Sequence, residues 1–297
     1  MLNLYRAEWR KAISNFKMTS FLVWIIPVGV FAFYLVLIIL SMFEKSLEAG
    51  VVYFGTGDWT ADSLNSWNMI IEFPSNVFTR MLPLAFMAVV IAGEYGWHTW
   101  KNSVPRAKRW KLLLAKLAAL VSLVTLALLL SALISAVGPA LGHRIHGLEY
   151  GPYLTGSRVG SFLLNTVRTC FISVLALIIL AGYAAICSLI TRSVLGGLLA
   201  GFGISMLDSL ALPLLQLLGN IMGRPELVNL YPYTPSYNLI NLQSWLLRGQ
   251  AVETFTIGVA MPTAGWGFWG SALILALWIL ILIACALYIF QRQDLTE

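Results

Sequence analysis

The chain has 297 residues, of which 59% are hydrophobic and only 11% are charged, whereas a typical soluble domain is about 25% charged. An ordinary soluble domain is excluded, because so large an apolar surplus must face lipid. The net charge of +6 does not indicate nucleic-acid binding, since the basic residues lie in short segments beside apolar runs and form no basic face on a soluble domain.

Residues 1–19 predict an amphipathic helix that lies in the membrane interface. Tyr5, Trp9 and Ile13 recur at helical spacing, while Arg6 and Arg10 fall on other faces of the helix. The apolar run that follows is longer than the core of a signal peptide, and no small-residue cleavage site comes after it. We therefore expect this run to remain as a membrane anchor.

Six apolar stretches are long enough to cross a bilayer, which takes about 20 apolar residues. They cover residues 20–42, 77–93, 112–138, 161–190, 194–220 and 268–290, and the second is the shortest. The sequence therefore predicts an all-α integral membrane protein with six transmembrane helices in a single transmembrane domain, residues 1–297.

The placement of Lys and Arg predicts the orientation. With both termini inside, 12 of the 19 Lys and Arg residues lie on the cytoplasmic side and 7 on the outer side. The first outer loop is also rich in acidic residues: Glu44, Glu48, Asp58, Asp62 and Glu72. We expect both termini to be cytoplasmic.

The outer region 221–267 is too long for a plain connector. Residues 231–235 alternate Tyr and Pro around Thr234 and predict a turn, and residues 238–247 predict a short helix. This helix is expected at the outer interface or dipping into the protein. Trp266 and Trp269 then mark the start of the last span as an aromatic belt.

The sequence contains no catalytic or nucleotide-binding motif. It lacks the Gly-x-x-x-x-Gly-Lys-Ser/Thr phosphate loop, so the chain is not expected to hydrolyse ATP. The spacing of His143, His146 and Glu149 could bring two imidazoles and a carboxylate to one metal, but a solvated loop is the better interpretation. We expect no catalytic residue, no metal site and no cofactor bound directly.

Charged residues within spans are costly and therefore call for an explanation. Asp208 lies near the middle of the fifth span, where it would line a transport path or pair with a polar group across a helix interface. No ionisable partner is evident at the same depth. Arg80, Arg168 and Lys116 lie towards span ends, where their side chains are expected to snorkel to the interface.

Two glycines near the start of the fifth span predict close helix packing. Gly197 and Gly201 form a Gly-x-x-x-Gly pair, which lets two helix backbones approach each other. The pattern does not decide whether the contact is within the chain or with a second copy.

The segment 94–111 combines a carboxylate, aromatic side chains and a basic run. The positive-inside rule explains its Lys and Arg residues, but it does not explain Glu94 together with Trp97 and Trp100. Large aromatic side chains in a short loop indicate a surface for a partner. The candidate contact residues are Glu94, Tyr95, Trp97, Thr99, Trp100, Asn102, Arg106 and Arg109.

Four segments together resemble the permease subunits of type-2 ATP-binding-cassette exporters, in particular the bacterial antimicrobial-peptide resistance and immunity type. Residues 4–11 are similar to the family's amphipathic elbow helix, and residues 94–116 to its cytoplasmic coupling segment and the start of the third span. Residues 235–242 look like the region before the last span, and residues 290–295 like the closing pattern. At Gln293 the chain departs from that closing pattern, where a basic residue is often present.

The resemblance implies a complex of two permease copies, identical or related, with two separate ATPase subunits that bind ATP and magnesium. The coupling segment would dock on an ATPase, and the permease would export a lipophilic or amphipathic cargo, such as an antimicrobial peptide, a lipid or a drug. The expected location is the bacterial cytoplasmic membrane.

Two other function classes stay open. An ion-gradient-driven secondary transporter would be favoured by an internal repeat and by broken, paired helices. An intramembrane enzyme would need a nucleophile and a base, or two carboxylates, at one depth. The cargo is not evident from the sequence.

Overall fold

The computed structural model describes residues 1–14, 21–43, 56–72, 76–96, 108–145, 147, 149–252 and 265–293. Their regular elements are helices, apart from one isolated bridge between Asp58 and Gly151. The helices are α1 (Leu2–Ser14), α2 (Phe21–Phe43), α4 (Trp59–Asn68), α5 (Asn76–Thr79), α6 (Met81–Gly96), α8 (Arg109–Ile145), α9 (Gly156–Thr191), α10 (Val194–Ser209), α11 (Ala211–Met222), the 3-10 helix η3 (Pro225–Tyr233), α12 (Pro235–Arg248) and α13 (Phe268–Arg292).

Several of these helices are long and apolar enough to cross a membrane. Within the described residues there are five such segments, namely Phe21–Leu40, Val77–Gly96, Arg109–Ile145, Gly156–Thr191 and Phe268–Arg292. A sixth candidate is the pair α10 and α11, which qualifies only if both helices are taken together. The chain is therefore an all-α, multi-pass membrane protein.

The fifth predicted span is not the continuous helix that we expected. α10 and α11 meet at an angle of 70° at Leu210. The physical cause is Pro213, whose ring would clash with the carbonyl of Ser209 in a continuous helix and which has no N–H to donate to it. Pro83 is likewise four residues after Thr79, where α5 ends; Arg80 separates α5 from α6, which begins at Met81.

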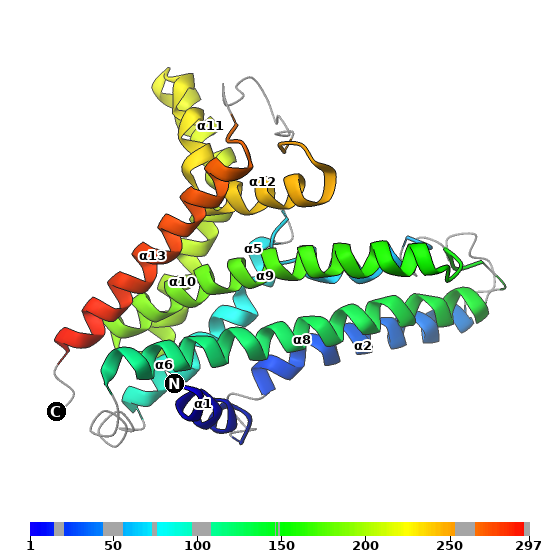
Figure 1. Ribbon diagram of the computed structural model, residues 1–297, viewed down its shortest axis with the longest axis horizontal. Helices are drawn as coiled ribbons and strands as arrows, with labels where there is room; N and C mark the ends of the chain where they lie inside the picture. The colour runs from blue at the N-terminus through cyan, green and yellow to red at the C-terminus, as the bar shows by residue number, and fades with distance from the viewer. Residues whose placement is uncertain are drawn as a thin grey trace.

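The helices form two groups that share the C-terminal half of α9 (Figure 1). α8 and α9 run side by side in opposite directions, with α2 along α8. The C-terminal half of α9 also packs against α6, α10 and α13. As a result α1, the end of α6, the start of α8 and the end of α13 gather at one end of the molecule, which we call the α1 end.

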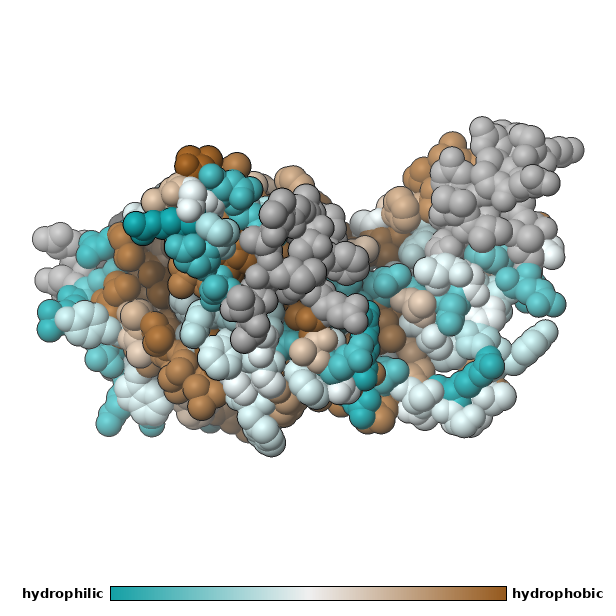
Figure 2. Space-filling view, turned by 90° about the horizontal axis from the view of Figure 1, so that it is seen from above, coloured by the Kyte–Doolittle hydropathy of each residue, from teal (hydrophilic) through white to brown (hydrophobic). Residues whose placement is uncertain are grey.

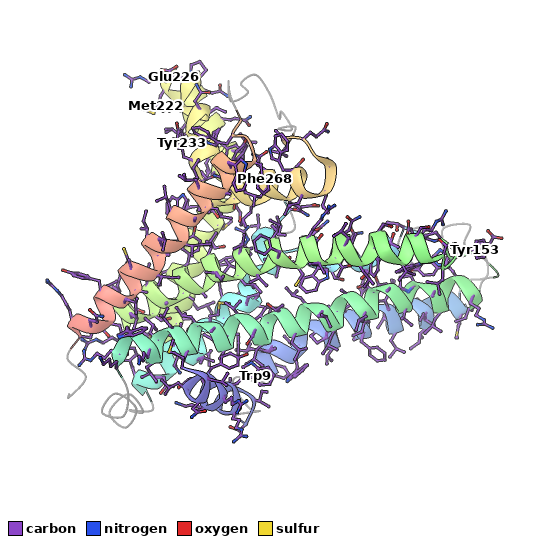
Figure 3. The ribbon with its side chains drawn as sticks, viewed as in Figure 1. Trp9, Tyr153, Met222, Glu226, Tyr233 and Phe268 are labelled. Carbon is purple, nitrogen blue, oxygen red and sulfur yellow. The ribbon has the colours of Figure 1, made fainter. Side chains whose placement is uncertain are left out.

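α8 and α9 are longer than predicted. The 37 residues of α8 extend about 55 Å, whereas the hydrocarbon core of a bilayer is about 30 Å thick. These two helices must therefore tilt strongly or continue beyond the hydrocarbon. Their far ends carry the loop that contains Tyr153, which Figure 3 places well away from Trp9 on α1.

The outer faces of the helices are apolar. α2 exposes Phe31, Phe33 and Leu40, and α13 exposes Trp269 and Leu273. Figure 2 shows broad apolar areas on the face of the molecule turned to the viewer. Exposed apolar side chains on this scale fit helices whose surroundings are lipid rather than water.

The turn and short helix predicted in region 221–267 are present as η3 and α12. Thr234 caps α12 with a hydrogen bond from the N–H of Tyr237, and Pro235 occupies the first helical position. Gly249, with φ of +74°, ends the helix in the left-handed conformation that glycine favours. α12 packs against α9 and α13, and nearly all of its first ten residues are buried, so it dips into the protein.

Candidate functional site

Four charged side chains form a cluster where α1, α6 and α8 meet. The ammonium group of Lys116 on α8 lies 2.6 Å from Glu94 on α6 and 2.7 Å from Glu8 on α1. Lys11 of α1 lies 2.5 Å from the same oxygen of Glu94. The side chains of Lys116 and Glu94 are 1% and 2% exposed. We call Glu8, Lys11, Glu94 and Lys116 the four-charge cluster; its charges balance, which avoids a buried charge without a partner.

Two hydrogen bonds add to the attachment of α1. The indole N–H of Trp9 donates to Ser122 Oγ on α8 at 2.8 Å, and the hydroxyl of Tyr5 lies 2.9 Å from the same atom. Arg6 and Arg10 are exposed on the other side of α1. α1 is therefore fixed to α8 by its aromatic side, a contact that the amphipathic pattern alone does not predict.

The end of α13 is held by side chains from other helices. Arg109 at the start of α8 donates to three backbone carbonyls there, those of Phe290 (3.2 Å), Gln291 (2.9 Å) and Gln293 (2.7 Å). The side chain of Gln293 donates to the carbonyl of Leu189 on α9 at 2.5 Å and accepts a hydrogen bond from Tyr95 on α6. These contacts satisfy carbonyls that the last turn of a helix leaves free, and they place a cation where the helix dipole favours one.

The predicted coupling residues fall partly within this region. Glu94, Tyr95 and Arg109 lie at the α1 end, on either side of the segment 97–107, and all three connect different helices. The other candidates lie outside the described residues: Trp97, Thr99, Trp100, Asn102 and Arg106.

The expectation that Lys116 snorkels to the interface is wrong. Its side chain is buried because two carboxylates from α1 and α6 surround its ammonium group. Snorkelling requires an open route along the helix to water, and α1 lies across that route. Arg168 on α9 is partly exposed, and for it snorkelling stays a prediction.

A second cluster lies where α10 and α11 meet. Arg80 donates from Nη1 to Ser209 Oγ at 2.9 Å, to Ser236 Oγ at 3.2 Å and to Asp208 Oδ2 at 3.4 Å. Its Nε donates to the carbonyl of Ile70 at 2.8 Å. The side chains of Arg80 and Asp208 are 2% and 6% exposed. We call Arg80, Asp208, Ser209 and Ser236 the break-point cluster, because it joins both helix breaks.

Asp208 is also bound by the first turn of α12. Ser236 donates to it from its backbone N–H at 3.0 Å and from its hydroxyl at 2.7 Å. Two expectations are therefore corrected: Arg80 does not snorkel, and Asp208 does have an ionisable partner. The sequence concealed the pair because Arg80 is near a span end, whereas Asp208 is near the middle of the predicted fifth span, which in the structure ends as α10 one residue later.

The glycine pair of α10 faces α9 within the same chain. A Cβ atom on Gly197 would lie 2.4 Å from Ser188 Oγ and 3.0 Å from Ser188 Cα. At Gly201 the nearest atom, in Ala184, would be 3.7 Å away, which is ordinary contact. The close approach of α10 and α9 thus occurs at Gly197.

The sequence favours a solvated loop rather than a metal site for His143, His146 and Glu149, and no three His, Cys, Asp or Glu residues are grouped for a metal in the described part of the chain. His146 lies outside that part. The ring of His143 is buried, donates from Nδ1–H to the carbonyl of Pro139 (3.0 Å) and lies 5.0 Å from the ring of Tyr150. Burial, followed by the nearby charge of Asp62, raises the pKa of Tyr150, so its hydroxyl stays protonated and donates to Asp62 at 3.1 Å.

No protein family, curated protein or solved structure that we compared with the chain matches it. The function is therefore inferred from the geometry of the two clusters. Both clusters connect helices, and each balances acids against bases in a buried setting. Such arrangements fix the relative positions of helices and can pass a displacement from one helix to the next.

Proposed function

We propose that the chain is the membrane-spanning permease subunit of an ATP-driven exporter of the ATP-binding-cassette type. In this proposal the segment 94–111 docks on a separate ATPase subunit, which binds ATP and magnesium. Both termini are then cytoplasmic, and the membrane is the bacterial cytoplasmic membrane. A second permease copy, identical or related, completes the translocation path for a lipophilic or amphipathic cargo.

The observation that supports this proposal best is the four-charge cluster. A partner that pushes on the segment between α6 and α8 acts on the chain next to Glu94 and Arg109. From there Glu94 connects to α8 and α1, and Arg109 connects to the end of α13. Force applied at one short segment would therefore reach four helices, as a coupling element requires.

Purification of the full chain from its native cells tests the proposal. We expect an ATPase subunit to co-purify in a fixed ratio. Trp97→Ala should strongly reduce the amount of co-purified ATPase, because it removes a large aromatic side chain from the docking segment. Trp269→Ala is the matched control, since Trp269 is exposed at the start of α13, and it should leave the ratio unchanged.

A secondary transporter is the second candidate, and one observation favours it. A broken span with a buried ion pair beside the break is typical of ion-coupled carriers. The two candidates differ in energy source. Substrate movement in proteoliposomes that contain an ion gradient, the chain and no ATPase would contradict the exporter proposal and support the carrier.

A further inference from the structure

Two interruptions of the helices, at Arg80 and at Leu210, lie against each other, although the segment 77–96 remains one candidate span across the first. Arg80 is the residue between α5 and α6, and Asp208 and Ser209 are the last residues of α10 before its bend. The guanidinium of Arg80 bridges from the first break to both residues of the second. Neither break depends on this bridge, since Pro83 and Pro213 interrupt the two helices independently.

The first turn of α12 is bound at the same point. Asp208 accepts two hydrogen bonds from Ser236, so its carboxylate is both the counter-ion of Arg80 and a negative charge at a helix N-terminus. The middle of α12 is tied to α13, where Asn241 donates to Ser271 Oγ at 2.8 Å and to the carbonyl of Trp266 at 2.7 Å. The position of the start of α12 is thus set by Asp208.

α6 connects this point with the four-charge cluster. Arg80 directly precedes α6, and Glu94 lies in its last turn, about 21 Å further along the helix axis at 1.5 Å per residue. Pro83 lies in the first turn of α6, where it does not interrupt the remainder of the helix. One uninterrupted helix therefore carries a buried ionic contact at each end.

We propose that Arg80 and Asp208 form a latch that holds the start of α12 at the bend between α10 and α11, and that α6 links the state of this latch to the four-charge cluster. The latch closes when Arg80 and Ser236 both bind Asp208. Loss of either contact frees α12 to move against α9 and α13. This proposal concerns the isolated chain and does not depend on the energy source of transport.

Amide hydrogen exchange of the full chain in lipid nanodiscs, read by mass spectrometry, tests the latch. Arg80→Gln leaves Asp208 buried without a counter-ion. We expect peptides from α12 to exchange at least about tenfold faster than in the native chain, because local opening becomes easier. Arg80→Lys keeps the charge and should restore most of the protection. Arg168→Gln, the same change at a partly exposed arginine on α9, should have no effect.

Exchange in the C-terminal half of α9, residues 172–189, distinguishes a latch from a general stabilising role. The proposal requires its exchange to stay as in the native chain while that of α12 rises. Equal acceleration in both regions, or unchanged exchange in α12, would overturn it. If Arg80→Gln does not yield folded protein, Ser236→Ala takes its place as the test of the latch. This variant keeps the ion pair and removes one hydrogen bond to Asp208. It should still accelerate exchange in α12.

The link through α6 has its own test. Glu94→Gln alters the four-charge cluster at the far end of α6, about 21 Å along the helix from Arg80. We expect faster exchange in α12 with unchanged exchange in residues 172–189 of α9. If α12 is unaffected by Glu94→Gln but responds to Arg80→Gln, the latch stands and the link is refuted.

Discussion

Lys116 is buried and pairs with two carboxylates, while Lys11 supplies the second positive charge of the cluster. Glu8 comes from α1 and Glu94 from α6, so one ammonium group connects three helices. Burying charges is costly, and a buried pair often contributes little net stability, but the removal of one partner leaves an uncompensated charge. The cluster is therefore sensitive to changes of a single residue.

Lys116→Met should lower the free energy of unfolding by about 3–5 kcal/mol, because Glu8 and Glu94 would remain buried without their common cation. Thermal and denaturant unfolding in detergent measure the change. Lys108→Met, at an exposed position just before α8, is the control and should change stability little. Adding Glu94→Gln to Lys116→Met should recover part of the loss. If Lys116→Met has the same free energy of unfolding as the native chain, this result would contradict the burial of Lys116 and Glu94.

The sequence could not show these pairings, although it showed most of their members. Glu94 and Asp208 stood out because they are acids in apolar surroundings. Their partners were missed because Lys116 and Arg80 each looked like an ordinary basic residue at a span end. Only the folded chain brings Glu8 to Lys116 and Arg80 to Asp208, and side-chain contacts between such distant positions leave no local pattern.

At the scale of helices, the start of α10 packs closely against the end of α9 at Gly196 and Gly197. The space at Gly197 is filled by Ser188, whereas Gly201 has ordinary contact distances. Since the two glycines sit one turn apart on the same helix, they form a matched pair for substitution.

Gly197→Val should destabilise the protein by about 1–3 kcal/mol, because its side chain would overlap with Ser188 on α9. Gly201→Ala should be tolerated, since its Cβ meets Ala184 at 3.7 Å. The unfolding temperature of each purified variant checks both expectations. Equal losses from the two changes would contradict the difference in packing between Gly197 and Gly201.

Hydropathy predicted the existence of the long helices well, because a helix surrounded by lipid must be apolar along its length. Their ends were less predictable. α8 and α9 continue beyond their most apolar parts, where the sequence no longer needs to be apolar. The break at Leu210 does have a sequence signal in Pro213, which hydropathy ignores because proline there lies in an otherwise apolar run.

At the scale of the whole molecule, the number of crossings determines where the termini lie. α1 and the end of α13 are at the same end of the molecule (Figure 1). An even number of crossings, with α10 and α11 counted as one broken span, agrees with this arrangement. Five crossings would place the two termini on opposite sides of the membrane.

Single-cysteine labelling tests the six-crossing topology, after Cys170, Cys187 and Cys285 are replaced by serine. In intact cells a membrane-impermeant thiol reagent should modify Tyr153→Cys, which lies in the loop between α8 and α9 and is exposed. It should modify Ser14→Cys and Arg292→Cys only after lysis. Modification of Arg292→Cys but not Ser14→Cys in intact cells would indicate five crossings.

The distance in sequence between the two members of the latch has a consequence for biosynthesis. Arg80 and Asp208 are separated by 128 residues, so a ribosome adding 5–20 residues per second needs about 6–26 s to produce the second after the first. During that time Arg80 has no Asp208 to pair with. Because Arg80 lies at one end of the segment 77–96, its side chain can reach the lipid headgroups in the meantime. We therefore expect the buried position of Arg80 to be reached only after α10 has been made.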